Sequence, residues 1–104
     1  MKNLFDIRDR VVVVTGGAGI LGRSICHYLA GQGARVVILD RDEAAGEELV
    51  AAIREEGGEA MFLVTDVLNR DVLVSNRETI LRDCGHIDVL LNACLLYTSP
   101  SPRD

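Results

Sequence analysis

The chain has 104 residues, of which 48% are hydrophobic and 26% are charged, and its formal net charge is -5. This length allows one domain at most, and an acidic chain with scattered arginines lacks the basic stripe of a nucleic-acid-binding surface. No apolar run is long enough to span a bilayer, and the N-terminal segment has no signal-peptide core. We expect a cytoplasmic protein that binds neither nucleic acid nor membrane.

The cysteines and histidines indicate no metal centre. Cys26, Cys84 and Cys94 are odd in number and lack the spacing of metal ligands. Free or buried thiols of a reducing compartment explain them better than a disulfide framework does. His27 and His86 also have no partner at metal-ligand spacing. We therefore predict that the chain holds no metal.

Strands and helices are expected to alternate along the chain. The continuous apolar run at residues 11–15 is typical of a parallel strand that is covered on both faces. A helix is expected from residue 19 to about residue 32, and its apolar side would be formed by Ile20, Leu21, Ile25, Tyr28 and Leu29. A second strand at residues 34–40 and a second helix, which begins after Asp42 as its N-cap and stops at Gly57 and Gly58, come next.

The same alternation continues to residue 92. A third strand is predicted at residues 60–64, a third helix from about Asn69 to Cys84 with a stop at Gly85, and a fourth strand at residues 87–92. Such alternation implies right-handed parallel crossovers. The predicted fold is the N-terminal half of a doubly wound parallel α/β (Rossmann) sheet, truncated, with strand order 3-2-1-4.

A glycine-rich turn joins the first strand to the first helix, with the sequence Thr-Gly-Gly-Ala-Gly-Ile-Leu-Gly. Gly16 permits a turn that a Cβ would obstruct. Gly17 and Gly19 would let the backbone approach phosphates, and Gly22 would let the helix pack on the strand. The free N–H groups and the dipole of the helix N-terminus attract an anion. We predict a dinucleotide pyrophosphate site formed by Gly16, Gly17, Gly19, Ile20, Leu21 and Gly22; a turn without a ligand is the alternative.

An acidic residue ends the second strand at the expected distance from the glycines. Asp40 would accept hydrogen bonds from both hydroxyls of an adenosine ribose and would repel a 2′-phosphate, which favours NAD over NADP. Arg41 follows and would attract a phosphate, so NADP is disfavoured rather than excluded. The alternative is that Asp40 is a helix-capping residue together with Asp42.

Further candidate residues follow the third and fourth strands, at the sheet edge where ligands of open α/β folds bind. Asp66 and Val67 come just after the third strand, and Asp66 would either reach adenine or cap a turn. Asn92 and Ala93 end the fourth strand, where they would face the cofactor or bridge the strands. Structural and functional roles are hard to separate at Asn92.

Together these motifs resemble the N-terminal half of the short-chain dehydrogenase/reductase family. The shared features are the glycine turn, Asp40, the pair Asp66 and Val67, and the stretch Gly-His-Ile-Asp-Val-Leu-Leu-Asn-Ala at residues 85–93. The resemblance implies a partial NAD-binding domain at residues 1–93 of a hydride-transferring enzyme. It also implies a small-molecule substrate and a homo-oligomer for the full-length protein. The family's catalytic Ser and Tyr-x-x-x-Lys are absent, so we expect no catalytic residue and no activity in this chain.

The turn departs from the common family pattern, because position 20 is Ile and the glycine stands at position 19. This spacing is similar to the extended branch of epimerases and dehydratases, whereas the later motifs resemble single-domain members. Among those, the turn and the start of the third helix resemble oxidoreductases of the D-mannonate (fructuronate reductase) type. A stand-alone dinucleotide-binding or redox-sensing module is a further alternative.

The last eleven residues break the pattern of the chain. Residues 94–104 contain two closely spaced prolines, Pro100 and Pro102, which neither a helix interior nor a central strand accepts. Their sequence is identical to one translated reading frame of a widely used transposase sequencing adapter. We expect residues 94–104 to be non-native adapter read-through, and the predicted fold therefore does not include them. A natural Ser/Pro tail is the alternative.

Overall fold

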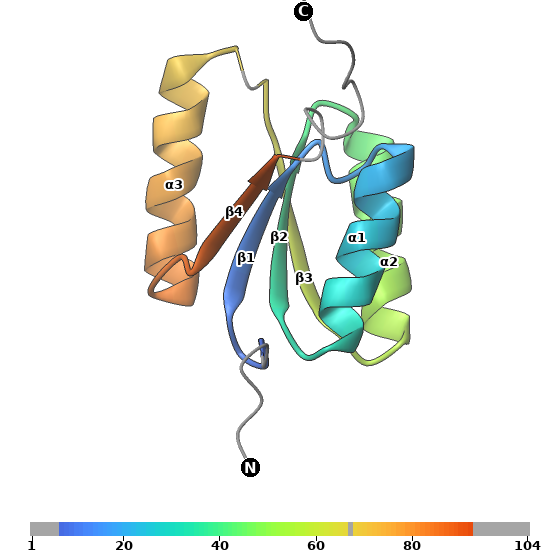
Figure 1. The fold of residues 1–104 in the computed structure, drawn as a ribbon. Helices are drawn as coiled ribbons and strands as arrows, with labels where there is room; N and C mark the ends of the chain where they lie inside the picture. The colour runs from blue at the N-terminus through green and yellow to red at the C-terminus, as the bar shows by residue number, and fades with distance from the viewer. Residues whose placement is uncertain (1–6, 67, 93–104) are drawn as a thin grey trace, which may run out of the picture.

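The computed structural model describes residues 7–66 and 68–92. They form a four-stranded parallel sheet in the order β3-β2-β1-β4, flanked by three helices (Figure 1). The elements are β1 (Val11–Thr15), α1 (Ile20–Gly31), β2 (Arg35–Asp40), α2 (Glu43–Glu55), β3 (Glu59–Val64), α3 (Arg70–Cys84) and β4 (Val89–Asn92). The predicted Rossmann half-sheet and its strand order are confirmed. Val67, Ala93 and the tail at 94–104 lie outside the described residues.

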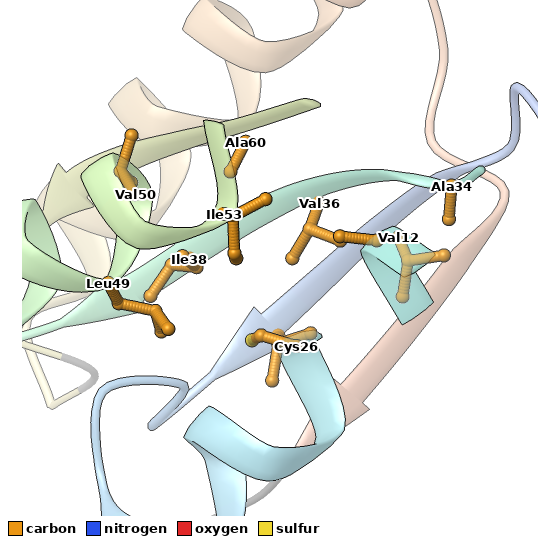
Figure 2. Packing of buried hydrophobic residues seen from close by; sticks show 11 residues of the cluster. Val12, Cys26, Ala34, Val36, Ile38, Leu49, Val50, Ile53 and Ala60 are labelled. Carbon is orange, nitrogen blue, oxygen red and sulfur yellow. The ribbon is translucent and has the colours of Figure 1, made fainter. Parts of the chain in front are cut away.

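The sheet is covered on both faces, by α1 and α2 on one side and by α3 on the other (Figure 1). Alternate residues of β1 therefore enter two different cores. Val12 and Val14 pack with Cys26, Ile38 and other residues beneath α1 and α2 (Figure 2). Val11 and Val13 join the smaller cluster on the α3 side, with Val37, Leu39 and Ile80. A strand buried on both faces has to be apolar throughout, which explains the valine run.

Helix α1 buries a different face from the one expected. Its buried residues are Gly22, Cys26 and Ala30, each four positions from the next. Ile20, Tyr28 and Leu21 are 77%, 65% and 36% exposed, so the prediction that they belong to the buried side was wrong. Small residues on the buried face let the helix approach the sheet closely, and the hydrophobicity pattern alone does not reveal this. The predicted residues Ile25 and Leu29 do pack against the core.

Most helix boundaries were predicted correctly because local hydrogen bonds define them. The Asp42 and Asn69 side chains cap α2 and α3 by accepting from the N–H groups of Ala45 and Val72, at 3.1 and 3.2 Å. Gly85 ends α3 in the left-handed conformation, with φ 89°. Within the described residues, no helix is long and apolar enough to cross a membrane.

Strand β4 begins at Val89, two residues later than expected. Asp88, just before it, is bonded to Val11 of β1 through both its backbone and its side chain, and its N–H donates to the Val11 carbonyl at 2.9 Å. Asp88 Oδ2 accepts from the Val11 N–H at 2.8 Å and lies 2.8 Å from His86 Nε2, and Arg10 is 3.5 Å from Oδ1. The Val11 hydrogen bond, aided by His86 and Arg10 and opposed by desolvation, holds the pKa of Asp88 below its ordinary value. The Asp88 carboxylate thus ties β4 to β1 at the sheet end opposite the glycine turn.

This pairing predicts a pH-dependent part of stability. Because folding lowers the pKa of Asp88, its contribution is complete above the unfolded pKa, about 4, and is lost as pH falls through the folded value. The asparagine side chain of the variant Asp88→Asn cannot ionise. We expect urea unfolding to show wild type more stable than Asp88→Asn at pH 6, with the difference vanishing at low pH. If the stability difference between wild type and Asp88→Asn did not change with pH, it would not arise from the ionised Asp88 carboxylate.

A second prediction concerns the contact between α2 and β3. A Cβ added at Gly46 would overlap the Phe62 ring and lie 2.5 Å from its Cζ atom. Gly46→Ala should therefore lower the free energy of unfolding by about 1–3 kcal/mol through overpacking, although alanine is the better helix former. Chemical denaturation measures the change, and the double variant with Phe62→Leu should recover part of the loss. A stabilised Gly46→Ala variant would show that helix propensity outweighs packing here.

Candidate cofactor site

The glycine turn is held between the ends of β1 and β2. Gly16 has φ 72°, the left-handed region that glycine adopts without strain, which confirms the expected turn at this position. Its N–H donates to the Leu39 carbonyl at 2.7 Å, and its own carbonyl accepts from the Gly19 N–H at 3.2 Å. The chain therefore leaves the sheet and reverses at once into α1, at the carboxyl end of the central strands.

The other three glycines of the turn differ in what a Cβ would meet. A Cβ at Gly22 would overlap the Gly16 carbonyl oxygen and lie 2.6 Å from the Gly17 Cα, so Gly22 permits the close packing of α1 on the turn. A Cβ at Gly17 would lie 3.0 Å from Ile38 Cγ2 and would thus point into the core. Gly19 is exposed, and its nearest neighbour would be 3.5 Å away. Approach of phosphates to Gly17 and Gly19 stays a prediction.

The N-terminus of α1 differs from the other two helix starts. Its N-cap is Gly19, which supplies no side-chain hydrogen bond, and its first turn contains no acidic residue. Helices α2 and α3 each have a capping side chain and an acid in the first turn. No side chain therefore caps the N-terminal N–H groups of α1, unlike those of the other two helices. Uncapped N–H groups at a helix N-terminus can bind a phosphate. The exposed residues Ile20 and Leu21 begin this helix.

Asp40 lies beside the turn and joins it to α2. Its Oδ2 accepts from the Ala18 N–H at 3.1 Å, and its Oδ1 accepts from the Asp42 N–H at 3.0 Å. Asp42, rather than Asp40, is the N-cap of α2. Each carboxylate oxygen of Asp40 retains a further lone pair, so the ribose hydroxyls remain possible donors. Arg41 follows with its side chain exposed.

The end of β3 places Asp66 at the same edge of the sheet. Asp66 is exposed, and its Oδ1 accepts from the Leu68 N–H at 3.0 Å, so it shapes the turn that leads into α3. The preceding residue, Thr65, is buried and bonded to Asn76 of α3 at 2.6 Å. Sequence reasoning missed Thr65 and Asn76, because neither belongs to a motif and their contact exists only once α3 lies against the sheet.

Asn92 ends β4 in register with Thr15 of β1. The Thr15 hydroxyl donates to the Leu91 carbonyl at 3.3 Å, which links the two strand ends next to the glycine turn. The structure thus places Asn92 at the same sheet edge as Gly16, Asp40 and Asp66. Its partners Val67 and Ala93 in the predicted site lie outside the described residues.

The described part of the chain shows no cluster of three or more His, Cys, Asp or Glu side chains that would hold a metal. Burial raises the pKa of the Cys26 thiol to about 12, so this thiol is protonated at neutral pH and acts as a packing residue. The candidate site thus consists of the glycine turn and of the polar residues at the carboxyl ends of the strands. Bound there, a dinucleotide would find pyrophosphate donors at α1 and a ribose acceptor at Asp40.

Comparison with known proteins agrees with this arrangement. Residues 10–101 match the short chain dehydrogenase family. The chain is 39% identical over 98 residues to cyclopentanol dehydrogenase of Comamonas sp., and the match covers 94% of this chain and 39% of that protein. The chain belongs to the short chain dehydrogenase family, and it spans well under half the length of this relative.

Two solved structures superimpose closely on the fold. One is a protein proposed to be a D-mannonate oxidoreductase, from Haemophilus influenza with bound NAD, at TM-score 0.78 and 27% identity; the match covers 82% of this chain and 30% of that one. The other is a metagenomic short-chain oxidoreductase in complex with NADP, also at TM-score 0.78, with 32% identity over 82% of this chain and 38% of that one. Structures similar to this chain thus bind either nicotinamide cofactor.

Proposed function

We propose that this chain is the cofactor-binding portion of an oxidoreductase that transfers hydride between a nicotinamide cofactor and a carbonyl or alcohol. One observation carries the proposal: the N-terminus of α1, which lacks a side-chain cap, adjoins the carboxylate of Asp40 at the sheet edge. This pairs an anion site with a ribose acceptor. Membership of the short chain dehydrogenase family supports hydride transfer as the reaction class.

The proposed cofactor is NAD. The Asp40 carboxylate, held by two backbone N–H groups, would repel a ribose 2′-phosphate. Arg41 lies beside it and would partly offset this repulsion. We therefore expect discrimination of about tenfold, or about 1.4 kcal/mol.

We further propose a small-molecule substrate and a sugar acid in particular, in a cytoplasmic, homo-oligomeric full-length protein. The similarity to a protein proposed to be a D-mannonate oxidoreductase supports the sugar acid. The relative that acts on cyclopentanol, by its name, points to a simpler alcohol. Oxidation assays of the full-length protein with D-mannonate and with cyclopentanol would distinguish the two substrate classes.

The chain alone is proposed to be inactive, because its sequence contains no Tyr-x-x-x-Lys and its only lysine is Lys2. Residues 94–104 are proposed to derive from a sequencing adapter, so that the native sequence continues differently after Ala93. A long read of the source DNA across codon 93 tests this. A frame that continues to a Ser and a Tyr-x-x-x-Lys would support the proposal, and the same eleven residues in independent DNA would refute it.

Calorimetric titration of the 104-residue chain with NAD and NADP tests the cofactor assignment. We expect NAD to bind about tenfold more tightly than NADP, and no reduced cofactor to form when alcohols are added. Preference for NADP would overturn the role of Asp40. NAD binding by a chain that DNA sequencing shows to be naturally complete would instead favour a stand-alone binding module.

A further inference from the structure

A buried hydroxyl joins two elements next to the proposed cofactor edge. Thr65 is 0% exposed and is the single buried polar or charged side chain within the described residues. Its Oγ1 donates to the Leu63 carbonyl at 2.8 Å and accepts from Asn76 Nδ2 at 2.6 Å. Because a buried hydroxyl cannot form hydrogen bonds with water, these two bonds compensate for the cost of burying it.

The backbone of Thr65 also connects the two acidic residues of the candidate site, Asp40 and Asp66. Its N–H donates to the Asp40 carbonyl at 2.8 Å, which extends the pairing of β3 with β2 by one residue. The next residue, Asp66, holds the following turn, since its carbonyl accepts from the Asn69 N–H at 2.8 Å. Asn76 is therefore linked through Thr65 to Asp40 by hydrogen bonds, and to Asp66 because Asp66 is the next residue in the chain.

Helix α3 has few other attachments that would orient this turn. Ile80 is its one buried residue, and Ile80 lies nearly three helical turns from the N-terminus of α3. Asn76 is half-buried and lies one turn closer to the site. The hydrogen bond from Asn76 thus links the first half of α3 to the end of β3.

We propose that Asn76 is a positioning residue for the adenine half of the cofactor. Through the Thr65 hydroxyl it holds the Asp66 turn against Asp40. This inference rests on the proposed function, since it assumes that a dinucleotide binds at this edge. Loss of the Asn76 amide leaves the Thr65 hydroxyl without its donor and the turn free to move. Binding of the dinucleotide would then have to order the turn, and the entropy lost in doing so would reduce the affinity for the dinucleotide.

Cofactor binding separates a positioning role from a merely structural one. The probes are NAD and nicotinamide hypoxanthine dinucleotide, which lacks the 6-amino group of adenine, titrated into the 104-residue chain. Asn76→Ala should weaken NAD binding about five- to tenfold and should weaken binding of the analogue less. The control Ser75→Ala, at an exposed neighbour on α3, should bind both dinucleotides as wild type does. Equal losses for the two dinucleotides would overturn the inference.

Hydrogen exchange tests the same idea without a cofactor. In Asn76→Ala, the amides of Thr65 and Asn69 should exchange about tenfold faster, while the Ile80 amide, deeper in α3, keeps its protection. Unchanged protection of Thr65 and Asn69 would overturn the inference. If wild type bound neither dinucleotide, the proposed function would fail, and the exchange rates would still decide whether Asn76 positions the turn.

Discussion

Gly22→Ala is expected to lower NAD affinity by about 100-fold, because a displaced helix N-terminus no longer meets the pyrophosphate. The added Cβ would overlap the Gly16 carbonyl oxygen and lie 2.6 Å from the Gly17 Cα. These are backbone atoms of the turn and cannot rotate away as a side chain does. Helix α1 must move outward, which separates its N-terminus from the turn and lowers the free energy of unfolding by about 1–3 kcal/mol. Calorimetry and urea unfolding measure the two effects.

Gly31→Ala, in the same helix, is the matched control. No atom lies within 4 Å of a Cβ built at Gly31. Alanine should therefore stabilise the chain by about 0.5–1 kcal/mol, because it loses less backbone entropy on folding, and NAD affinity should not change. Similar losses in both variants would mean that general helix effects, rather than contact with the turn, explain the result.

Asp40→Ala should lower both NAD affinity and stability. The alanine side chain cannot accept the hydrogen bonds that Ala18 and Asp42 donate to the carboxylate. Hydrogen bonds to charged groups contribute about 1.5–3 kcal/mol each, and partial exposure places these at the lower end. Loss of the ribose acceptor adds to the effect, so we expect NAD affinity to fall about 100-fold. Calorimetric titration and thermal unfolding of the same samples measure both losses.

Two further variants separate the charge of Asp40 from its hydrogen bonds. Asp40→Asn removes the charge and leaves one acceptor oxygen, so the NAD-to-NADP affinity ratio should fall toward one. Asp42→Ala removes only the cap of α2, which lowers stability by about 1 kcal/mol and should leave that ratio unchanged. An unchanged ratio in Asp40→Asn would refute electrostatic discrimination at this site.

The architecture of this protein can be predicted from its sequence, because the relevant interactions are local or periodic. The valine run of β1 predicted a strand covered on both faces, and the caps Asp42 and Asn69 marked helix starts through bonds to residues three positions away. The glycine turn and Asp40 predicted the candidate site at the carboxyl edge. The resemblance to short-chain dehydrogenases then followed from the order and spacing of these motifs.

The faces and contacts that these elements use depend instead on how the elements pack in three dimensions. The buried face of α1 consists of small residues, Gly22, Cys26 and Ala30, which let the helix lie close to the sheet, whereas Ile20 and Tyr28 are exposed. Hydrophobic periodicity reports how apolar side chains are arranged around one helix and not the distance from that helix to its neighbour. The Thr65–Asn76 bond was hidden for the same reason: the two residues meet only when a helix and a strand end are brought together in space.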